Sequence, residues 1–279
     1  MRVIYINKFM FNFNPFKFDR VNILIVLVFL SSCQQVSHYS KLIKTNEWNS
    51  TIVSGHGFNH LLVDNLKPTA EFIHIYIEGD GKPLNYLGDP SIDPTPEFPL
   101  TLALMSRDKA HSFYIGRPCY FQVYSADCKQ DLWTEGRYSE PVVNSLSKVV
   151  SDLSSESNRS VVLIGFSGGG ALAALIANRN SDVSILITIN GNLDLLEWTK
   201  YHGTIPLTNS LNPISEQSEI NNLIRKIFLV GEKDAVVPRK ISRHYVNKHG
   251  GELVEYADFS HVCCWLDIWS DIFTDLQIP

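Results

Sequence analysis

Short apolar runs rich in β-branched residues alternate with helix-like segments along most of the chain. The apolar runs predict strands over residues 58–64, 71–77, 113–115, 160–164, 183–189, 226–230 and 252–256. The segments between them predict helices over residues 100–109, 140–153, 171–178 and 266–276. Strands that alternate with helices are typical of βαβ units, so we expect an α/β fold with a mostly parallel central sheet and helices on both faces.

In two further segments the apolar residues follow neither a helical nor a strand periodicity. Residues 83–99 contain five prolines, which predicts a rigid, irregular loop that walls one side of a site. Residues 195–222 contain Pro206 and Pro213 and several Asn and Ser residues. We expect them to form a small cap over the carboxyl edge of the sheet.

The start of the chain has a pattern of its own. Basic residues precede an unbroken apolar run at 21–30 (VNILIVLVFL), which has the length of a signal-peptide core. A spanning helix needs about 20 apolar residues, so a permanent transmembrane anchor is the weaker interpretation. The residues LSSC at 30–33 resemble the bacterial lipobox, in which the cysteine is acylated and becomes the mature N-terminus. An ordinary secretory signal that ends near Cys33 is the alternative, and Met10 is an alternative start.

This interpretation sets the domain organisation. We expect a lipoprotein-type signal peptide over residues 1–32, a tether over 33–47 with Cys33 as the lipid attachment point, and one catalytic domain over 48–279. Gln34 rather than Asp follows the cysteine. By the same resemblance this favours export to the periplasmic side and anchoring to the bacterial outer membrane.

Charge excludes one class of partner. The chain of 279 residues has a formal net charge of −5, and removal of residues 1–32 takes away four Lys/Arg and one Asp, which leaves 20 basic and 28 acidic residues, a net charge of −8. Nucleic-acid binding needs clustered Lys and Arg to neutralise phosphates. We therefore expect no nucleic-acid partner.

Four cysteines remain after Cys33, an even number that makes disulfides plausible in an oxidising compartment. Cys119 and Cys128 are the expected pair. The adjacent Cys263 and Cys264 either form a vicinal bridge or include a buried thiol that packs as a small apolar group. No Cys/His spacing matches a zinc site, and we expect no metal.

The sequence GFSGGG at 165–170 joins a predicted buried strand to a predicted helix. Its first five residues match G-x-S-x-G in the strand-turn-helix context that a nucleophile elbow requires. Glycines two residues to either side of the serine relieve Cβ clashes in this sharp turn, while the serine Oγ points into a cleft. Ser167 is therefore the candidate nucleophile. Phosphate binding at this turn is a weak alternative, because the P-loop lysine and the G-x-G-x-x-G spacing are absent.

Two later segments complete a resemblance to the α/β-hydrolases. Residues 227–238 (IFLVGEKDAVVP) resemble that family's strand with a G-x-x-D turn, and residues 256–262 (YADFSHV) resemble its last strand and histidine loop. The order Ser, Asp, His is also that of the family. The resemblance covers most of the mature chain and implies the α/β-hydrolase fold, with His261 as general base for Ser167 and Asp234 as the residue that orients the histidine.

The resemblance also implies an oxyanion hole. The N–H of Gly168 is one donor, and the N–H of Asp80, in the sequence EGDG at 78–81, is the candidate for the other. Glu78 stands where the family often has a histidine, and a simple glycine-rich turn is the alternative interpretation of this loop. Glu232 is a fallback for the acid of the triad.

Other polar and aromatic residues near these motifs have weaker signals. One group is Asn190, Asn192 and Asp194, which we expect to form a turn rather than line a pocket. The other is Trp133, Arg137 and Tyr138, which we expect to serve packing and capping rather than substrate contact.

The predicted function is hydrolysis of a carboxylic ester through an acyl-serine intermediate, with a small-molecule substrate and no cofactor. Thioesters, amides and peptides use the same machinery. The short cap, which is not dominated by large apolar residues, favours a small or moderate acyl or alcohol group. The alternative is a lipoprotein that uses the scaffold only to bind a ligand or partner, since a fold does not dictate a function.

Overall fold

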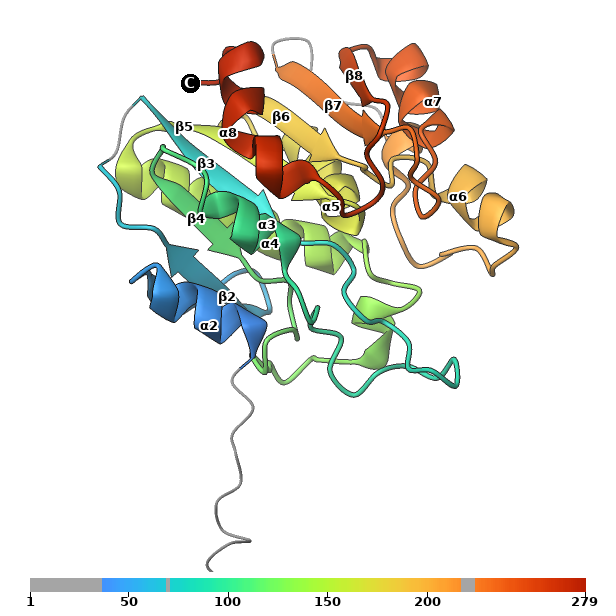
Figure 1. Cartoon of the computed structure of the whole chain (residues 1–279). Helices are drawn as coiled ribbons and strands as arrows, with labels where there is room; N and C mark the ends of the chain where they lie inside the picture. The colour runs from blue at the N-terminus through green and yellow to red at the C-terminus, as the bar shows by residue number, and fades with distance from the viewer. Residues whose placement is uncertain (1–36, 69–70, 217–223) are drawn as a thin grey trace, which may run out of the picture. The chain divides into compact units, whose positions relative to one another are not determined.

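A single eight-stranded sheet organises the protein (Figure 1). The computed structural model describes residues 37–68, 71–216 and 224–279, so the predicted signal peptide and Cys33 lie outside the described residues. The strands are β1 (Asn49–Ser54), β2 (Asn59–Asp64), β3 (Phe72–Ile77), β4 (Ser112–Ile115), β5 (Ser160–Phe166), β6 (Val183–Ile189), β7 (Arg225–Gly231) and β8 (Glu252–Tyr256). Their order across the sheet is β1-β2-β4-β3-β5-β6-β7-β8. The pairs β1–β2 and β2–β4 are antiparallel, and the strands from β4 to β8 pair in parallel.

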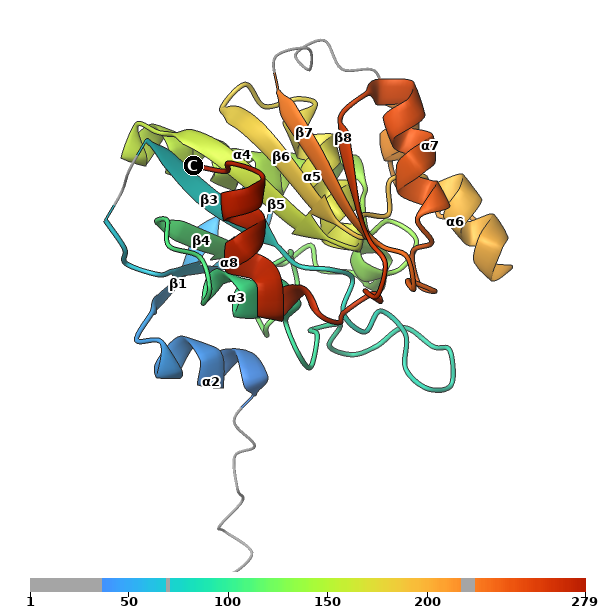
Figure 2. The same cartoon turned by 45° about the horizontal axis from the view of Figure 1, so that its top comes forward.

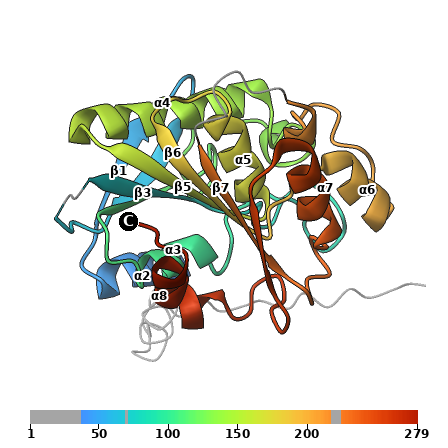
Figure 3. The ribbon, with the colours of Figure 1, turned by 90° about the horizontal axis from the view of Figure 1, so that it is seen from above.

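Helices cover both faces of this sheet. The described helices are α2 (His38–Thr45), α3 (Leu100–Met105), α4 (Glu140–Ser157), α5 (Gly168–Ala177), α6 (Leu195–His202), α7 (Lys240–His249) and α8 (Trp265–Asp275), with short 3₁₀ turns at Gln130–Trp133 and Pro213–Ser215. Figure 3, which looks along the sheet edge-on, shows α4, α5 and α7 on one face and α3 and α8 on the other. The predicted α/β fold with a mostly parallel sheet is therefore confirmed.

The centre of the sheet is apolar on both sides. β5 (SVVLIGF) is buried at every position but its first, as a parallel strand between two helical layers requires. α5 (GGGALAALIA) is buried along its whole length, because its glycines and alanines allow the helix to approach the sheet closely. The turn between these elements is thus held between a buried strand and a buried helix.

The amino-acid pattern does not predict β1, because its residues NSTIVS are mostly exposed and show no apolar alternation. The pattern also fails for α7, which buries only three side chains, those of Ile241, Ser242 and Tyr245. Both elements lie toward the margins of the sheet, where little apolar surface is needed for packing.

Part of the segment predicted as a tether, residues 33–47, is helix α2 in the structure. No side chain of α2 is fully buried, but Tyr39, Leu42 and Ile43 pack against the core. Ser37 caps this helix by accepting a hydrogen bond from the amide of Ser40. The compact unit of the described chain accordingly begins at residue 37.

The cysteines pair as two disulfides. Cys119 bonds to Cys128, as expected, and the adjacent Cys263 and Cys264 also bond to each other. The second bridge lies directly after the histidine loop. No helix among the described residues has the length and apolarity to cross a membrane.

Candidate active site

Ser167 sits in the sharp turn between β5 and α5 with φ 54° and ψ −118°, in a region of backbone space that non-glycine residues rarely occupy. Its amide donates to the carbonyl of Ile189 at 2.9 Å, which ties the turn to the neighbouring strand. A Cβ on Gly165 would overlap the carbonyl of Gly169, and a Cβ on Gly169 would overlap that of Ile77. The glycines of the motif are therefore required by close backbone contacts, as the sequence pattern predicts.

The structure brings the three residues of the predicted triad together. His261 Nε2 lies 3.0 Å from Ser167 Oγ, and His261 Nδ1 lies 2.7 Å from Asp234 Oδ2. The other oxygen of Asp234 accepts the amides of Val236 at 2.7 Å and Val237 at 2.9 Å. These bonds fix the carboxylate in the turn after β7 with one oxygen aimed at the imidazole.

The histidine loop is held in place by Asn190, at the end of β6. Its side-chain amide donates to the carbonyls of Ser260 and His261 at 3.1 and 3.0 Å, and its Oδ1 accepts the amide of Gly231 at 2.8 Å. One fully buried side chain thus joins the carboxyl ends of β6 and β7 to the loop after β8. The prediction of a turn residue was incomplete, because these partners lie 41 to 71 positions away along the chain.

The loop after β3 lies directly against the nucleophile turn. A Cβ on Gly79 would be 3.3 Å from Cβ of Ser167, and one on Gly168 would overlap the carboxylate of Asp80. Within the ranges that the structure describes, neither the amide of Asp80 nor that of Gly168 donates to another protein group. Both proposed oxyanion donors are therefore free beside Ser167.

The carboxylate of Asp80 is the centre of a buried ionic network. It pairs with Arg117 Nη1, with Arg137 Nη1 at 3.0 Å, and with the hydroxyl of Tyr138 at 2.6 Å, while Tyr120 donates to the Asp80 carbonyl at 2.9 Å. Burial alone would raise the pKa of Asp80, but the two guanidinium groups and the Tyr138 hydroxyl lower it to about 2. The network fixes both the side chain and the backbone of the residue that carries the proposed second donor.

Glu78, at the end of β3, fills the place where a histidine is familiar. Its carboxylate accepts the amide of Gly79 at 3.1 Å, and the amide and hydroxyl of Thr101, each at 3.0 Å. Burial raises its pKa from 4.5 to about 7, and these hydrogen bonds offset only part of that effect. Glu78 therefore links the loop after β3 to the start of α3.

The raised pKa predicts a pH-dependent stability. In the unfolded chain the Glu78 carboxyl ionises near its ordinary pKa of 4.5, and in the folded protein it ionises only near 7. As the pH rises from 4.5 to 7, the free energy of unfolding of the wild type therefore falls by about 3 kcal/mol. Glu78→Gln removes the titration, so the variant should gain stability relative to wild type as the pH rises from 4.5 to 8. Urea unfolding at both pH values measures this. Glu97→Gln, which replaces an exposed carboxyl, is the control. If the free energy of unfolding of Glu78→Gln differed from that of the wild type by the same amount at both pH values, the raised pKa of Glu78 would be contradicted.

A half-open pocket of about 370 Å³ lies over these groups. Its wall includes Ser167 and His261, the loop at 78–83, and Pro96 and Phe98 of the proline-rich loop. This agrees with the prediction that residues 83–99 form one wall.

Asn192 and Arg137, for which the sequence gives weak signals, also line the pocket, as does Trp198 on α6, for which it gives none. Asn192 donates its amide to the Ser167 carbonyl at 3.0 Å, and its buried Oδ1 has no partner in the described structure. We predicted only a turn role for Asn192 and only a packing or capping role for Arg137. Both predictions were too narrow, because both residues also line the pocket.

The remaining candidates have structural roles. Asp194 caps α6 by accepting the amide of Glu197 at 3.2 Å, as a turn residue would. Trp133 donates to the carbonyl of Ser91 at 3.1 Å. Glu232 pairs with Arg239 at the surface, so Asp234 rather than Glu232 reaches the histidine.

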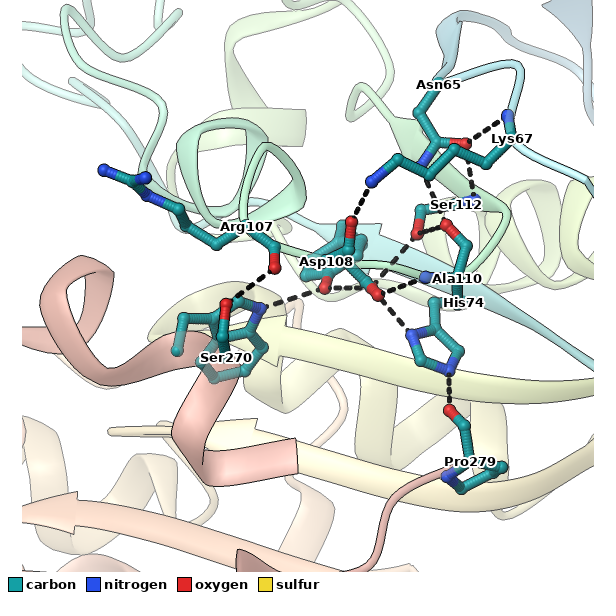
Figure 4. Close-up of polar contacts among 11 residues, drawn as sticks. Asn65, Lys67, His74, Arg107, Asp108, Ala110, Ser112, Ser270 and Pro279 are labelled. Atoms are coloured by element: carbon teal, nitrogen blue, oxygen red, sulfur yellow. Dashed lines mark hydrogen bonds and ion pairs between the residues drawn. The ribbon is translucent and has the colours of Figure 1, made fainter. Parts of the chain in front are cut away.

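A second histidine-aspartate pair lies away from this pocket (Figure 4). His74 Nδ1 contacts Asp108 Oδ2 at 2.7 Å, and its Nε2 contacts the carbonyl oxygen of Pro279 at 3.0 Å. The hydroxyls of Tyr76 and Ser112 bond to Asp108 and not to the imidazole. Among the residues that the structure describes, no hydroxyl is placed to lose a proton to His74, so we assign this cluster a structural role. Among the described residues, no group of three or more His, Cys, Asp or Glu side chains is arranged to hold a metal ion.

Comparisons with known proteins bear on the fold. No family model matches the chain, and no curated protein matches its sequence. Solved structures do match. An α/β serine hydrolase without a lid from Xanthomonas campestris has TM-score 0.53 and 12% identity, over 82% of this chain and 94% of its own. An esterase from Pyrococcus furiosus has TM-score 0.55 and 12% identity, over 84% and 92%.

A third match is α/β hydrolase domain-containing protein 10 from mouse, with TM-score 0.56 and 14% identity over 82% of this chain and 98% of its own. Identities this low carry information about architecture and not about substrate. Together with the eight-stranded sheet and its helical layers, these similarities show that the chain has the α/β-hydrolase fold.

Proposed function

We propose that this protein is a serine hydrolase that cleaves a carboxylic ester through an acyl-serine intermediate. The observation that carries the proposal is the continuous hydrogen-bonded line from Asp234 through His261 to Ser167, at 2.7 and 3.0 Å. A serine hydroxyl is a poor nucleophile near neutral pH unless a base removes its proton during attack. The line supplies that base, and a carboxylate that selects its tautomer.

In the proposed reaction, Ser167 Oγ attacks the ester carbonyl carbon as His261 Nε2 takes the hydroxyl proton. The negative charge that develops on the carbonyl oxygen is stabilised by the amides of Asp80 and Gly168. His261 then returns the proton to the departing alcohol, which leaves the acyl group on Ser167. Water then attacks the acyl carbonyl carbon as His261 Nε2 takes one of its protons, and His261 returns that proton to Ser167 Oγ as the bond to the acyl group breaks and the acid leaves.

The proposal extends to location. We propose that Cys33 carries a lipid and anchors the domain at the periplasmic side of a bacterial outer membrane. The support is the sequence LSSC at 30–33 after the apolar run, together with a compact unit that begins at residue 37. A small or moderate acyl or alcohol group is the preferred substrate, since the pocket holds about 370 Å³.

The deciding test is covalent labelling. A fluorophosphonate should react with the wild-type protein, and peptide mass spectrometry should locate the adduct on Ser167. Nitrophenyl esters of graded acyl length should be hydrolysed, with an optimum that sizes the pocket. Absence of both labelling and hydrolysis would contradict the hydrolase function and favour the alternative, a protein that uses this fold only to bind a ligand or partner.

A further inference from the structure

Exposed apolar side chains gather around the mouth of the pocket. Thirteen large apolar side chains of the described chain are exposed. Ten of them belong to segments that line the pocket or flank it, namely Leu84, Tyr86, Leu87, Ile92, Phe98, Leu196, Tyr201, Ile205, Val236 and Val262. Such a concentration, unlike scattered exposed residues, marks a surface that binds an apolar partner.

The two most exposed of these side chains, those of Tyr86 and Ile92, lie on the loop at 83–99, which we call the docking loop. Figures 1 and 2 both show this loop as a projection from the body of the domain. Tyr86 is 95% exposed, Leu87 70% and Ile92 90%. None of these three lines the pocket.

The tip of the docking loop is an ordered turn. Asn85 Oδ1 accepts the amides of Leu87 at 2.8 Å and Asp89 at 3.0 Å, and the Asn85 amide donates to the carbonyl of Asp89 at 2.8 Å. Farther back, the amide of Ser91 donates to the carbonyl of Pro83 at 3.0 Å. The apolar side chains are thus held out in water by a defined backbone, so their insertion into a partner needs little further ordering.

The folded unit begins beside the same loop. His38, the first residue of α2, packs its ring edge-on against Phe98 with 6.2 Å between centroids. Phe98 in turn lines the pocket. Cys33 is five residues before His38, so the extended chain between them spans at most about 17 Å. A lipid on Cys33 therefore keeps the bilayer close to the base of the docking loop.

We propose that Tyr86, Leu87 and Ile92 insert into the surface of the bilayer that anchors the chain and hold the mouth of the pocket at that surface. The enzyme then takes esters presented by the membrane. This inference rests on the proposed function and on the proposed lipid anchor. Tyrosine and aliphatic side chains suit the boundary between head groups and acyl chains.

The charge of the domain indicates how the loop binds. The mature chain has a net charge of −8, as derived above from the sequence, and the docking loop contains Asp89, Asp93 and Glu97 but no basic residue. Electrostatic attraction to anionic lipids needs clustered Lys or Arg. Insertion is accordingly apolar, and it should be strong on neutral lipid and insensitive to salt.

The first experiment measures insertion in the full, lipid-modified protein, reconstituted into phosphatidylcholine vesicles. Mass spectrometry first checks the acyl group on Cys33, and an unmodified cysteine would overturn the inference. Ile92→Trp and the matched Ile52→Trp, whose native side chain is 61% exposed on β1, are compared after subtraction of wild-type fluorescence. Lipids brominated on the upper acyl chain should quench the added fluorescence of the Ile92→Trp variant and not that of the Ile52→Trp variant, with and without 0.5 M NaCl. Equal quenching at both positions, or loss of quenching in salt, would overturn it.

The second experiment measures catalysis. Leu87→Ser with Ile92→Ser is compared with Ile52→Ser with Leu66→Ser, a pair of exposed aliphatic side chains that lie outside both the docking loop and the pocket lining. The substrates are water-soluble nitrophenyl butyrate and a butyryl ester held in the same vesicles. The ratio of vesicle to soluble activity should fall about tenfold or more in the loop variant and stay unchanged in the control.

The two proposals fail in different ways. An unchanged ratio in the loop variant would overturn docking while the hydrolase function stands. Quenching of the Ile92→Trp variant, in a protein inert on both esters, would retain docking and overturn the hydrolase function.

Discussion

Replacing Ser167 with alanine should lower kcat on a nitrophenyl ester by about a millionfold, because nucleophile and base act as one unit in this mechanism. Labelling by a fluorophosphonate should disappear with it. Ser50→Ala, on the exposed strand β1, is the control and should keep full activity. A residual rate near that of wild type would place the chemistry at another residue.

The loss in the Ser167 variant should not come from unfolding. Alanine keeps the Cβ at φ 54°, so the backbone conformation of the turn is neither relieved nor made worse. The lost hydroxyl faces the pocket and bonds only to His261 in the described structure. The free energy of unfolding should change by less than about 1 kcal/mol, measured with urea.

Asp80→Asn should cost about 3–5 kcal/mol of unfolding free energy, because it leaves the guanidinium groups of Arg117 and Arg137 buried without their counter-charge. Their side chains are only 1% and 10% exposed. The variant keeps the backbone amide that is the proposed oxyanion donor but loses the ion pairs that hold this amide in place. We therefore expect kcat to fall by about ten- to a hundredfold as well.

The acid dependence of the Asp80 variant gives a second readout. The pKa of Asp80 is lowered from 3.8 to about 2, so its stabilisation is fully present above pH 3.8 and is lost as the pH falls toward 2. Asp80→Asn should therefore unfold with a weaker acid dependence than wild type in that range.

Asp152→Asn, which breaks an exposed pair with Lys148 at 2.7 Å, is the matched control for loss of an ion pair and should cost below about 1 kcal/mol. Equal costs for the two substitutions would show that the Asp80 network contributes little.

Local signals in the sequence were sufficient for the central part of the fold. β5 and α5 were predictable because a run buried on both faces and a run of small residues each have a distinctive composition. The turn that contains Ser167 could be recognised from the glycines its geometry needs. Asp234 and His261 were found through resemblance in order and strand context, and the structure places His261 beside Ser167 and Asp234 beside His261.

The supporting groups could not be predicted in the same way. Asp80 meets Arg117, Arg137 and Tyr138 across 37, 57 and 58 positions of sequence, and no local pattern records such partners. Asn190 is similar, since its role depends on where the loop after β8 comes to lie. The role of a buried polar residue can be inferred only when its partners are known. Both the desolvation cost of its burial and the stabilisation from its hydrogen bonds depend on those partners.

The order of strands has a consequence for how the protein is assayed. Ser167, Asp234 and His261 follow β5, β7 and β8, and β8 forms the last edge of the sheet and the last strand in the described chain. A molecule whose carboxyl-terminal third has not docked lacks both the proposed acid and the proposed base, however well the rest has folded. In the proposed mechanism, with hydrolysis of the acyl-serine as the slow step, a stoichiometric burst of nitrophenol would count the completely folded molecules in a preparation. The growth of that burst during refolding would time the docking of the carboxyl-terminal third.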